Sequence, residues 1–409
     1  MEAKALKDKY ELKELELNSL LEITQAINNN LPEASLYKIY HFTLRASLNI
    51  KRLALYVLDE QWSCKVNFGT LRNFNEISLD DRFFKIKDIT TINTSDPDFV
   101  FNEFDIIIPV THKKNTLAFV LVGELRNDHL GPEIDANTTF IQALSNIILV
   151  AIENKKLARR QLRQEALRKE LEIAKQVQQL LFPKNLPHEP DLTVEASYLP
   201  HHSVGGDYYD YVPINEDKFL LCIADVSGKG VPAAILMSNF QATLRTLARK
   251  TTQLKEIVKD LNFQILQNAS GENFITFFLA IFDRKTDTLH YINAGHNPPI
   301  LIDEKHGLRM LEKGTTILGV FKDLPFINEG IIPDLGSFFF FSYTDGLPET
   351  FNAAEEPFGI ERLKEYLLGA QHKALKVIHE EILTLLNDFK GPNIYGDDIT
   401  FLSCKLLKK

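Results

Sequence analysis

The spacing of apolar positions changes twice along the first 150 or so residues of this 409-residue chain. Residues 1–30 place apolar side chains at helical spacing among many Lys and Glu residues, which predicts a helix. The segment 53–58 alternates as a strand does, and apolar runs on either side of a short polar turn predict a hairpin over 104–125. Residues 138–152 return to helical spacing. This order indicates an α+β domain over residues 1–152.

Residues 153–182 contain no Gly or Pro and predict one long, charged helix that stops at Pro183. A heptad frame places five apolar residues on one seam: Leu157, Leu167, Leu171, Ala174 and Leu181. The same seam also contains Arg160, Gln164 and Gln178, so a coiled coil built on it would be imperfect. Two interpretations stay open: a linker helix that forms a homodimer, and a solvated connector that packs on its own chain.

From residue 183 onward the pattern becomes richer in short strands. Strand-like runs occur at 192–198, 218–223, 274–283, 288–292, 338–343 and 400–406. Helix-like segments occur at 231–249, 253–268, 359–369 and 373–389. This order predicts a second α+β domain, residues 183–409, in which sheets are covered by helices.

Composition narrows the class of protein. An apolar fraction of 44% and a charged fraction of 25% are those of a soluble globular protein, and the length predicts two or three domains. The net charge of −9 argues against a nucleic-acid-binding surface. The charged N-terminus is not a signal peptide. The longest apolar runs, around 147–152 and 338–341, are too short to span a membrane and predict a buried helix and a buried strand.

The three cysteines are Cys64, Cys222 and Cys404, and they are far apart in the sequence. Their spacing argues against both a disulfide scaffold and a zinc-cysteine site. We therefore expect a cytoplasmic protein.

Four aspartates of the second domain lie in glycine-containing turns at or near strand ends: Asp207, Asp225, Asp345 and Asp397. A strand fixes the direction of a carboxylate, and a neighbouring glycine lets the backbone turn sharply beside a ligand. Several carboxylates aimed at one point repel each other unless a cation neutralises them. Oxygen ligands alone would select a hard cation such as Mg²⁺ or Mn²⁺. Each motif alone is more often an ordinary turn, so the interpretation depends on all four together.

An ordered series of motifs supports that interpretation. It consists of QLLFP at 179–183, GGDYYD at 205–210, ADVSGKG at 224–230, PAA at 232–234, the segment 241–247, NAGHNPP at 293–299, TDG at 344–346, PFG at 357–359 and DDIT at 397–400. From about residue 174 to residue 406 the chain resembles the PPM-type (protein phosphatase 2C) family. The resemblance is to its bacterial branch, which controls sigma-factor regulators in stress responses and sporulation.

The resemblance implies a β-sandwich flanked by helices with a dinuclear metal site, holding Mg²⁺ or Mn²⁺. Asp207 matches the first acidic ligand, Asp225 the ligand that bridges both metals, and the carbonyl of Val226 the backbone ligand beside it. Asp345 and Asp397 match the remaining carboxylates. The implied reaction is hydrolysis of phosphoserine or phosphothreonine by attack of a water shared between the metals, with Asp225 and Asp207 as the central catalytic residues.

The resemblance is less specific about the roles of the residues around these ligands. Gly206, Gly346 and Asp398 are expected beside the ligands or the substrate, and Asp210 is more typical of a structural residue than of a ligand. Animal-type members of the family carry a histidine just after the bridging aspartate as a candidate general acid, and here Ser227 and Lys229 occupy that neighbourhood. The general acid therefore remains unassigned.

Two further side chains have two interpretations each. His296 is a candidate participant in proton transfer, although a lone histidine is more often a structural hydrogen-bonding residue. Lys229 would contact substrate phosphate or face water. For both residues the structural or solvated interpretation is favoured.

The first domain, from about residue 15 to 152, resembles a GAF-type sensor domain through its order of elements. Nothing in its sequence identifies a ligand, and the spacing of Cys64 neither supports nor excludes an attached chromophore. A domain that senses an unknown ligand or partner and a domain that only dimerises are both open. We hypothesise that a signal at this domain acts on the second domain through helix 153–182.

Three functions were compared. The leading one is a metal-dependent protein phosphatase acting on a phosphorylated regulatory protein, by resemblance an anti-sigma-factor antagonist. The alternative is a non-catalytic signalling scaffold with a phosphatase fold, against which all four aspartates are present. A diguanylate-cyclase-like turn at Gly205–Asp207 is discounted because Tyr208 and Tyr209 follow where that motif needs Glu-Phe.

Overall fold

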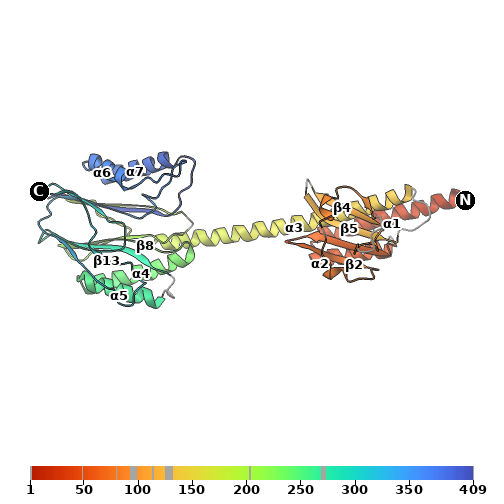
Figure 1. Cartoon of the computed structure of the whole chain (residues 1–409), viewed down its shortest axis with the longest axis horizontal. Helices are drawn as coiled ribbons and strands as arrows, with labels where there is room; N and C mark the ends of the chain where they lie inside the picture. Colours follow the sequence, from red (N-terminus) through yellow and green to blue (C-terminus); the bar gives the residue numbers. More distant parts are fainter. Residues whose placement is uncertain are drawn as a thin grey trace. The chain divides into compact units, whose positions relative to one another are not determined.

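The computed structural model describes residues 2–47, 49–79, 81–92, 99–112, 115–124, 132–201, 204–268 and 273–408. The chain divides into two compact units, residues 1–165 and 166–409 (Figure 1). The first unit holds one sheet, and the second unit holds two sheets.

The first unit is a five-stranded antiparallel sheet with helices before and after it. The strand order is β2-β1-β5-β4-β3. The strands are β1 (Arg52–Leu58), β2 (Trp62–Phe68), β3 (Thr90–Thr91), β4 (Ile106–His112) and β5 (Asn115–Gly123). The helices are α1 (Glu2–Asn28), α2 (Glu33–Phe42), the π-helix η1 (Thr43–Ser47), the short 3₁₀ helices η2 (Phe74–Glu76) and η3 (Phe83–Lys85), and α3 (Pro132–Gln179). The predicted strand, hairpin and leading helix are confirmed, whereas α2 and β2 were not predicted.

Alternating side chains of β1 and β5 separate the two faces of this sheet. One face packs on helical residues, and Leu55 and Val120 share a core cluster with Tyr40 of α2. On the other face, Tyr56 of β1 and Phe119 of β5 pack in one cluster with aromatic side chains of the connecting segments, which are Phe74, Phe83, Phe101 and Phe104. The Tyr56 hydroxyl donates to the carbonyls of Phe74 and Ile77. The assignment of this unit to the GAF type stays a prediction.

Helix α3 contains both predicted helical segments, 138–152 and 153–182, which follow each other directly in the sequence. The structure has one helix, Pro132–Gln179, and it ends three residues before the predicted boundary. Leu180 and Leu181 continue it only as a turn, donating to the carbonyls of Val177 and Gln178. Pro183 cannot extend a helix and restricts the residue before it, so the helix stops ahead of it.

The second unit contains the remaining elements. The strands are β6 (Leu192–Leu199), β7 (Tyr208–Pro213), β8 (Lys218–Val226), β9 (Ile275–Asp283), β10 (Thr288–Ala294), β11 (Ile300–Asp303), β12 (Gly307–Met310), β13 (Gly314–Thr315), β14 (Gly330–Ile332), β15 (Phe338–Tyr343) and β16 (Ile399–Leu406). The helices are α4 (Val231–Lys250), α5 (Leu254–Asn268), α6 (Ile360–Ala370) and α7 (Leu375–Lys390). Every strand and helix predicted here is confirmed within a few residues, and β7 and β11–β14 were not predicted.

Two sheets pack face to face in this unit. One has the order β13-β10-β9-β8-β7 with β14 against β10, and the other has the order β12-β11-β15-β16-β6. Phe278, Phe340 and Leu402 are among the residues that fill the space between the sheets. The outer face of the first sheet packs on α4 and α5, and that of the second on α6 and α7. Figure 1 shows these two helix pairs on opposite sides of the sheets.

The structure bears on the expected membrane segments, the cysteines and the two longest apolar runs. No helix among the described residues is both long and apolar enough to cross a membrane. Cys64, Cys222 and Cys404 are all free thiols. The apolar run 338–341 is a buried strand, and the run 147–152 lies in α3 with Ile148, Leu149 and Ile152 buried and Ile147 exposed.

A buried histidine joins α7 to the second sheet. The His379 Nδ1 atom lies 2.9 Å from the Ser197 hydroxyl, and its Nε2 atom lies 2.6 Å from the Ser403 hydroxyl. Burial lowers the pKa of His379 to about 3. The unfolded chain therefore binds the proton first as the pH falls, and the stability that neutral His379 contributes is lost from about pH 6.5 toward pH 3.

We predict that His379→Gln removes this acid sensitivity. The difference in free energy of unfolding between wild type and variant should narrow by about 2 kcal/mol between pH 7 and pH 5, at roughly 1.4 kcal/mol per pH unit below the unfolded pKa. Urea unfolding followed by circular dichroism measures it. Fluorescence of Trp62, the single tryptophan, reports the first unit and serves as an internal control. A difference that stays constant with pH would contradict the prediction.

Candidate metal centre

Two of the four predicted ligands lie at the ends of neighbouring strands in the first sheet. Asp207 directly precedes β7, and Asp225 is the next-to-last residue of β8. The strands are antiparallel, and Tyr208 pairs with Ala224. One residue further along, Asp207 and Asp225 face each other across the strands.

The second sheet carries the other two predicted metal ligands. Asp345 follows the end of β15 by two residues, and Asp397 precedes the start of β16 by two residues. The two strands are neighbours, with Tyr343 paired to Phe401. Each sheet therefore supplies two aspartates at one edge of the sandwich.

Asp207 is fixed by hydroxyl groups of the opposite sheet. Its Oδ2 atom accepts hydrogen bonds from Thr344 Oγ1, at 2.9 Å, and from Thr400 Oγ1. The side chain is buried, with 2% of its surface exposed. Burial, together with the nearby Asp225 carboxylate, raises the pKa of Asp207 well above its usual value. The two threonines thus hold a carboxylate in one orientation at a site where an uncompensated charge is costly.

Asp398 ties the loop before Asp207 to the loop before β16. Its Oδ1 atom accepts from the backbone N–H of His201 at 2.7 Å, and its Oδ2 atom accepts from that of Gly206 at 3.0 Å. The side chain is buried and already engaged at both oxygens. The contacts make Asp398 a positioning residue for the loop that carries Asp207.

Glycines are required here by close approach of the backbone. A Cβ atom on Gly206 would lie 2.6 Å from the carbonyl oxygen of Val226, and one on Gly346 would lie 2.1 Å from the carbonyl oxygen of Asp398. On Gly205 it would lie 2.0 Å from Asp398 Oδ2. A side chain at any of the three positions would force the loops apart. The carbonyl of Val226, the predicted backbone ligand, is therefore next to the loop of Asp207.

The remaining aspartates are more accessible and influence each other. Burial raises the pKa of Asp225 to about 7, and the charges of Asp345 and Asp397 add to the effect. Burial and the charge of Glu349 also raise the pKa of Asp345. The charges of Asp345 and Asp397, from the second sheet, therefore act on Asp225 in the first.

Lys229 supplies a positive charge at the accessible side of this cluster. Its Nζ atom lies 2.8 Å from Asp397 Oδ2 and donates to the carbonyl of Gly396 at 2.9 Å. The bond to Asp397 raises the pKa of Lys229. About half of each side chain is exposed, so the pair is a screened surface contact.

The donor set fits a hard divalent cation. In the described part of the chain, no three His, Cys, Asp or Glu side chains already converge into a metal-binding group. Asp207 is bonded to two threonines, and Asp397 is bonded to Lys229. The candidate donors are nevertheless all oxygens at one edge, which is the set that Mg²⁺ and Mn²⁺ prefer. Coordination by all four would require Asp397 to turn away from Lys229.

Asp210 has a different environment from the other aspartates. It is fully buried and accepts two hydrogen bonds from Arg245, at 2.7 and 3.0 Å, and one from the Tyr208 hydroxyl. Both carboxylate oxygens are thereby used. The contacts agree with the structural interpretation of Asp210.

His296 lies beside the strand that pairs with Asp225. Its Nδ1 atom is 2.8 Å from the Thr276 hydroxyl, and its backbone N–H donates to the Asn293 side chain. Thr276 is the cross-strand partner of Asp225. Burial lowers the pKa of His296 to about 4, so the ring is neutral near pH 7. A neutral, buried ring suits a positioning role better than a proton donor.

Three site residues were missed by sequence reasoning or assigned elsewhere. Thr344 and Thr400 lie within motifs that were quoted, but their hydroxyls were given no role. Gln178 was placed on the coiled-coil seam, whereas its amide is buried and bonded to Gly205. A polar residue on an apolar seam was the available signal for Gln178, because such a side chain needs a partner.

The second unit is similar in sequence to known proteins. Residues 215–407 match the family model of Stage II sporulation protein E, SpoIIE. Phosphoserine phosphatase RsbU of Bacillus subtilis is 29% identical over 243 residues, which cover 58% of this chain and 70% of RsbU. Protein IcfG of Synechocystis sp. is 27% identical over 266 residues, covering 58% of this chain and 41% of IcfG. The chain thus spans less than half the length of IcfG.

A solved structure shows the same fold. The SiaA-PP2C domain of Pseudomonas aeruginosa superposes with a TM-score of 0.54 at 20% identity. The match covers 60% of this chain and 98% of that domain. The second unit therefore has the PP2C fold, and the predicted β-sandwich flanked by helices is confirmed.

We predict that Asp210→Ala destabilises the second unit. The variant leaves the Arg245 guanidinium and the Tyr208 hydroxyl without their acceptor. Breaking a fully buried ion pair costs about 3–5 kcal/mol, and we expect about 2 kcal/mol because 38% of Arg245 is exposed. Urea unfolding measures the loss, with the exposed Asp217→Ala in the next turn as control. Equal stability of the two variants would contradict the structural role.

Proposed function

We propose that residues 215–407, which match the SpoIIE family model, form a phosphatase domain that hydrolyses phosphoserine or phosphothreonine on a regulatory protein. RsbU and RsbP of Bacillus subtilis are phosphoserine phosphatases by name, and for this reason we propose phosphoserine as a substrate group. An anti-sigma-factor antagonist is the substrate that the family resemblance favours.

One observation carries the proposal. Asp207 and Asp225 lie at strand ends of one sheet, and Asp345 and Asp397 lie beside strand ends of the other, so carboxylates far apart in sequence share a single edge of the sandwich. The mutual repulsion of these carboxylates opposes folding unless a cation neutralises it. The site would hold two Mg²⁺ or Mn²⁺ ions through these aspartates and the carbonyl of Val226. When bound, the ions would activate water and neutralise phosphoryl oxygens.

The protein's own groups position this chemistry. Thr344 and Thr400 orient the carboxylate of Asp207. Asp398 and Gly206 keep the preceding loop close to the carbonyl of Val226. On release from Asp397, the partly exposed ammonium of Lys229 would be available to a substrate phosphate. Among the described residues of the site, no side chain stands out as a proton donor, so leaving-group protonation is not assigned to a residue.

We also propose that α3 regulates the site. Gln178 lies near the C-terminal end of α3 and is buried. Its Nε2 atom donates to the carbonyl of Gly205 at 2.7 Å, and its Oε1 atom accepts from the Gly205 N–H at 3.3 Å. Gly205 is two residues before Asp207. A displacement of α3 would therefore act directly on the loop that carries a proposed ligand.

Apolar side chains of α3 support the homodimer interpretation of this helix. Two residues of the predicted seam are exposed, Leu157 with 46% and Leu167 with 56% of its surface. Exposed apolar positions along one helix are typical of a surface that a second helix covers. We propose that a second copy of the chain covers them, and light scattering of the purified protein measures the mass directly. The signal that the first unit receives would then act on α3 in the dimer.

The activity is tested with Asp225. We predict that Mn²⁺-dependent hydrolysis of a chromogenic phosphate ester falls at least a hundredfold in Asp225→Asn, because the carboxylate shared between both sheets loses its charge. Asp388→Asn, an exposed substitution on α7, is the matched control and should leave the rate unchanged. If the wild-type chain hydrolyses neither the ester nor any phosphoprotein with metal present, the scaffold function replaces the proposed one.

The regulation is tested with neighbouring glutamines. We predict that Gln178→Leu lowers Mn²⁺ affinity and hydrolysis about tenfold, because Gly205 loses both hydrogen bonds. Gln179→Leu, the exposed neighbour on the same helix, should leave both unchanged. Calorimetric titration measures the affinity. Regulation through α3 would be contradicted if deletion of residues 1–150 changed neither the rate nor the metal affinity.

A further inference from the structure

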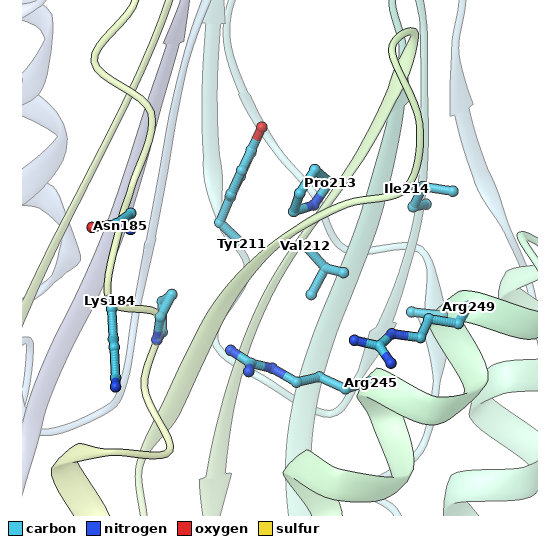
Figure 2. A pocket seen from close by; sticks show the side chains of 10 residues that line it. Lys184, Asn185, Tyr211, Val212, Pro213, Ile214, Arg245 and Arg249 are labelled. Carbon is cyan, nitrogen blue, oxygen red and sulfur yellow. The ribbon is translucent and has the colours of Figure 1, made fainter.

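A cavity of about 460 Å³ lies in the second unit between α4, β7 and the segment after α3. Its basic lining residues are Lys184, Arg245 and Arg249 (Figure 2). Figure 2 shows the two arginines extending from α4 toward the strand of Tyr211 and Val212, with Lys184 opposite them. None of the ten residues that line the cavity is acidic.

This charge distribution is the reverse of that of the whole chain. The protein has a net charge of −9, yet three cations surround one cavity. Arg245 is bonded to Asp210. Among the described contacts, Lys184 and Arg249 have no acidic partner. Two uncompensated cations beside a concave surface attract an anion.

The other walls of the cavity are apolar or aromatic. Val212 and Ile214 are partly buried against the core beneath α4, and the ring of Tyr211 packs on Phe219 at 5.6 Å. The volume is within the range of roughly 300–1,000 Å³ that is usual for small-molecule sites. A lone phosphate ion would leave most of it unfilled. The occupant that matches both properties has an anionic head and a compact apolar or aromatic body.

We propose that this cavity binds a small phosphorylated metabolite, with its phosphate held by Lys184, Arg245 and Arg249. Guanidinium groups match phosphate oxygens with paired, charge-assisted hydrogen bonds. The site is separate from the aspartate cluster, and the proposal does not depend on phosphatase activity. Asp210, three residues after Asp207, connects it to the metal centre, because Arg245 uses the same guanidinium for both contacts.

A simpler interpretation has to be separated from this one. Arg249 and Lys250 occupy the last turn of α4, where cations complement the helix dipole without any ligand. Lys250 is exposed and does not line the cavity, although it has the same charge and the same place on the helix. Lys250 therefore provides a matched control for a site-specific role of Arg249.

The test uses the full chain freed of metal, in which the carboxylate cluster repels phosphate. Inorganic pyrophosphate is the probe, and its binding is measured by calorimetry and by the shift of the melting temperature at constant ionic strength. We expect wild type and Lys250→Gln to bind equally. The double variant Lys184→Gln/Arg249→Gln should bind at least tenfold more weakly, with an unchanged melting temperature in the absence of probe.

Three outcomes would overturn the proposal. The first is a response to pyrophosphate no larger than the response to chloride. The second is equal weakening by Lys250→Gln, which would indicate a diffuse effect of charge. The third is a phosphoserine peptide that binds more tightly than pyrophosphate through Lys184 and Arg249, which would assign the cavity to a protein segment.

Discussion

The gathering of aspartate carboxylates at one edge of two packed sheets is the constraint on which the second unit depends. Asp207 is buried opposite Asp225, and the charges of Asp345 and Asp397 reach Asp225 from the other sheet. Mutual repulsion would separate these groups. Hydrogen bonds that cross between the sheets oppose it, from Thr344 and Thr400 to Asp207 and from Gly206 to Asp398. Positions 205, 206 and 346 are glycines because the loops approach too closely there for a Cβ atom.

The loop that carries Asp207 is also held from outside the sandwich. Gln178 on α3 bonds to Gly205 on one side of Asp207, and Arg245 on α4 bonds to Asp210 on the other. Both contacts involve elements that other molecules could reach. Helix α3, which carries Gln178, has exposed apolar side chains, and Arg245 of α4 lines a basic cavity. We infer that the ligand geometry at Asp207 is the point where external signals would act. A segment held at both of its ends, at Gly205 and at Asp210, responds to a change at either end.

Much of this arrangement could be predicted from the sequence, and the failures have physical reasons. Strands such as β15 and helices such as α4 were predicted closely, because their apolar periodicity is long and regular. Strands of two to four residues, such as β11, carry too few positions to show a period. The helical segments predicted at 138–152 and 153–182 form the single helix α3, because no Gly or Pro separates them. Strand β7 was missed because its motif was treated as a turn.

Side-chain partners were harder to predict than elements. The aspartates were identified by their motifs, but the threonine hydroxyls and the Lys229 contact come from residues brought together only by the folded sheets. The same holds for Gln178: periodicity predicted its position on the seam, but its partner, Gly205, is brought to it only by the fold. The basic cavity has no sequence signature, because Lys184 and Arg249 are 65 positions apart and neither belongs to a motif.

The central claim is that carboxylates of both sheets form one two-metal centre. Anomalous diffraction from crystals of the protein soaked in Mn²⁺ tests it most directly. The account predicts two manganese peaks, both in contact with Asp225, with Asp207 on one side and Asp345 and Asp397 on the other. The absence of any peak at Asp225, or a single ion bound elsewhere on the chain, would contradict it.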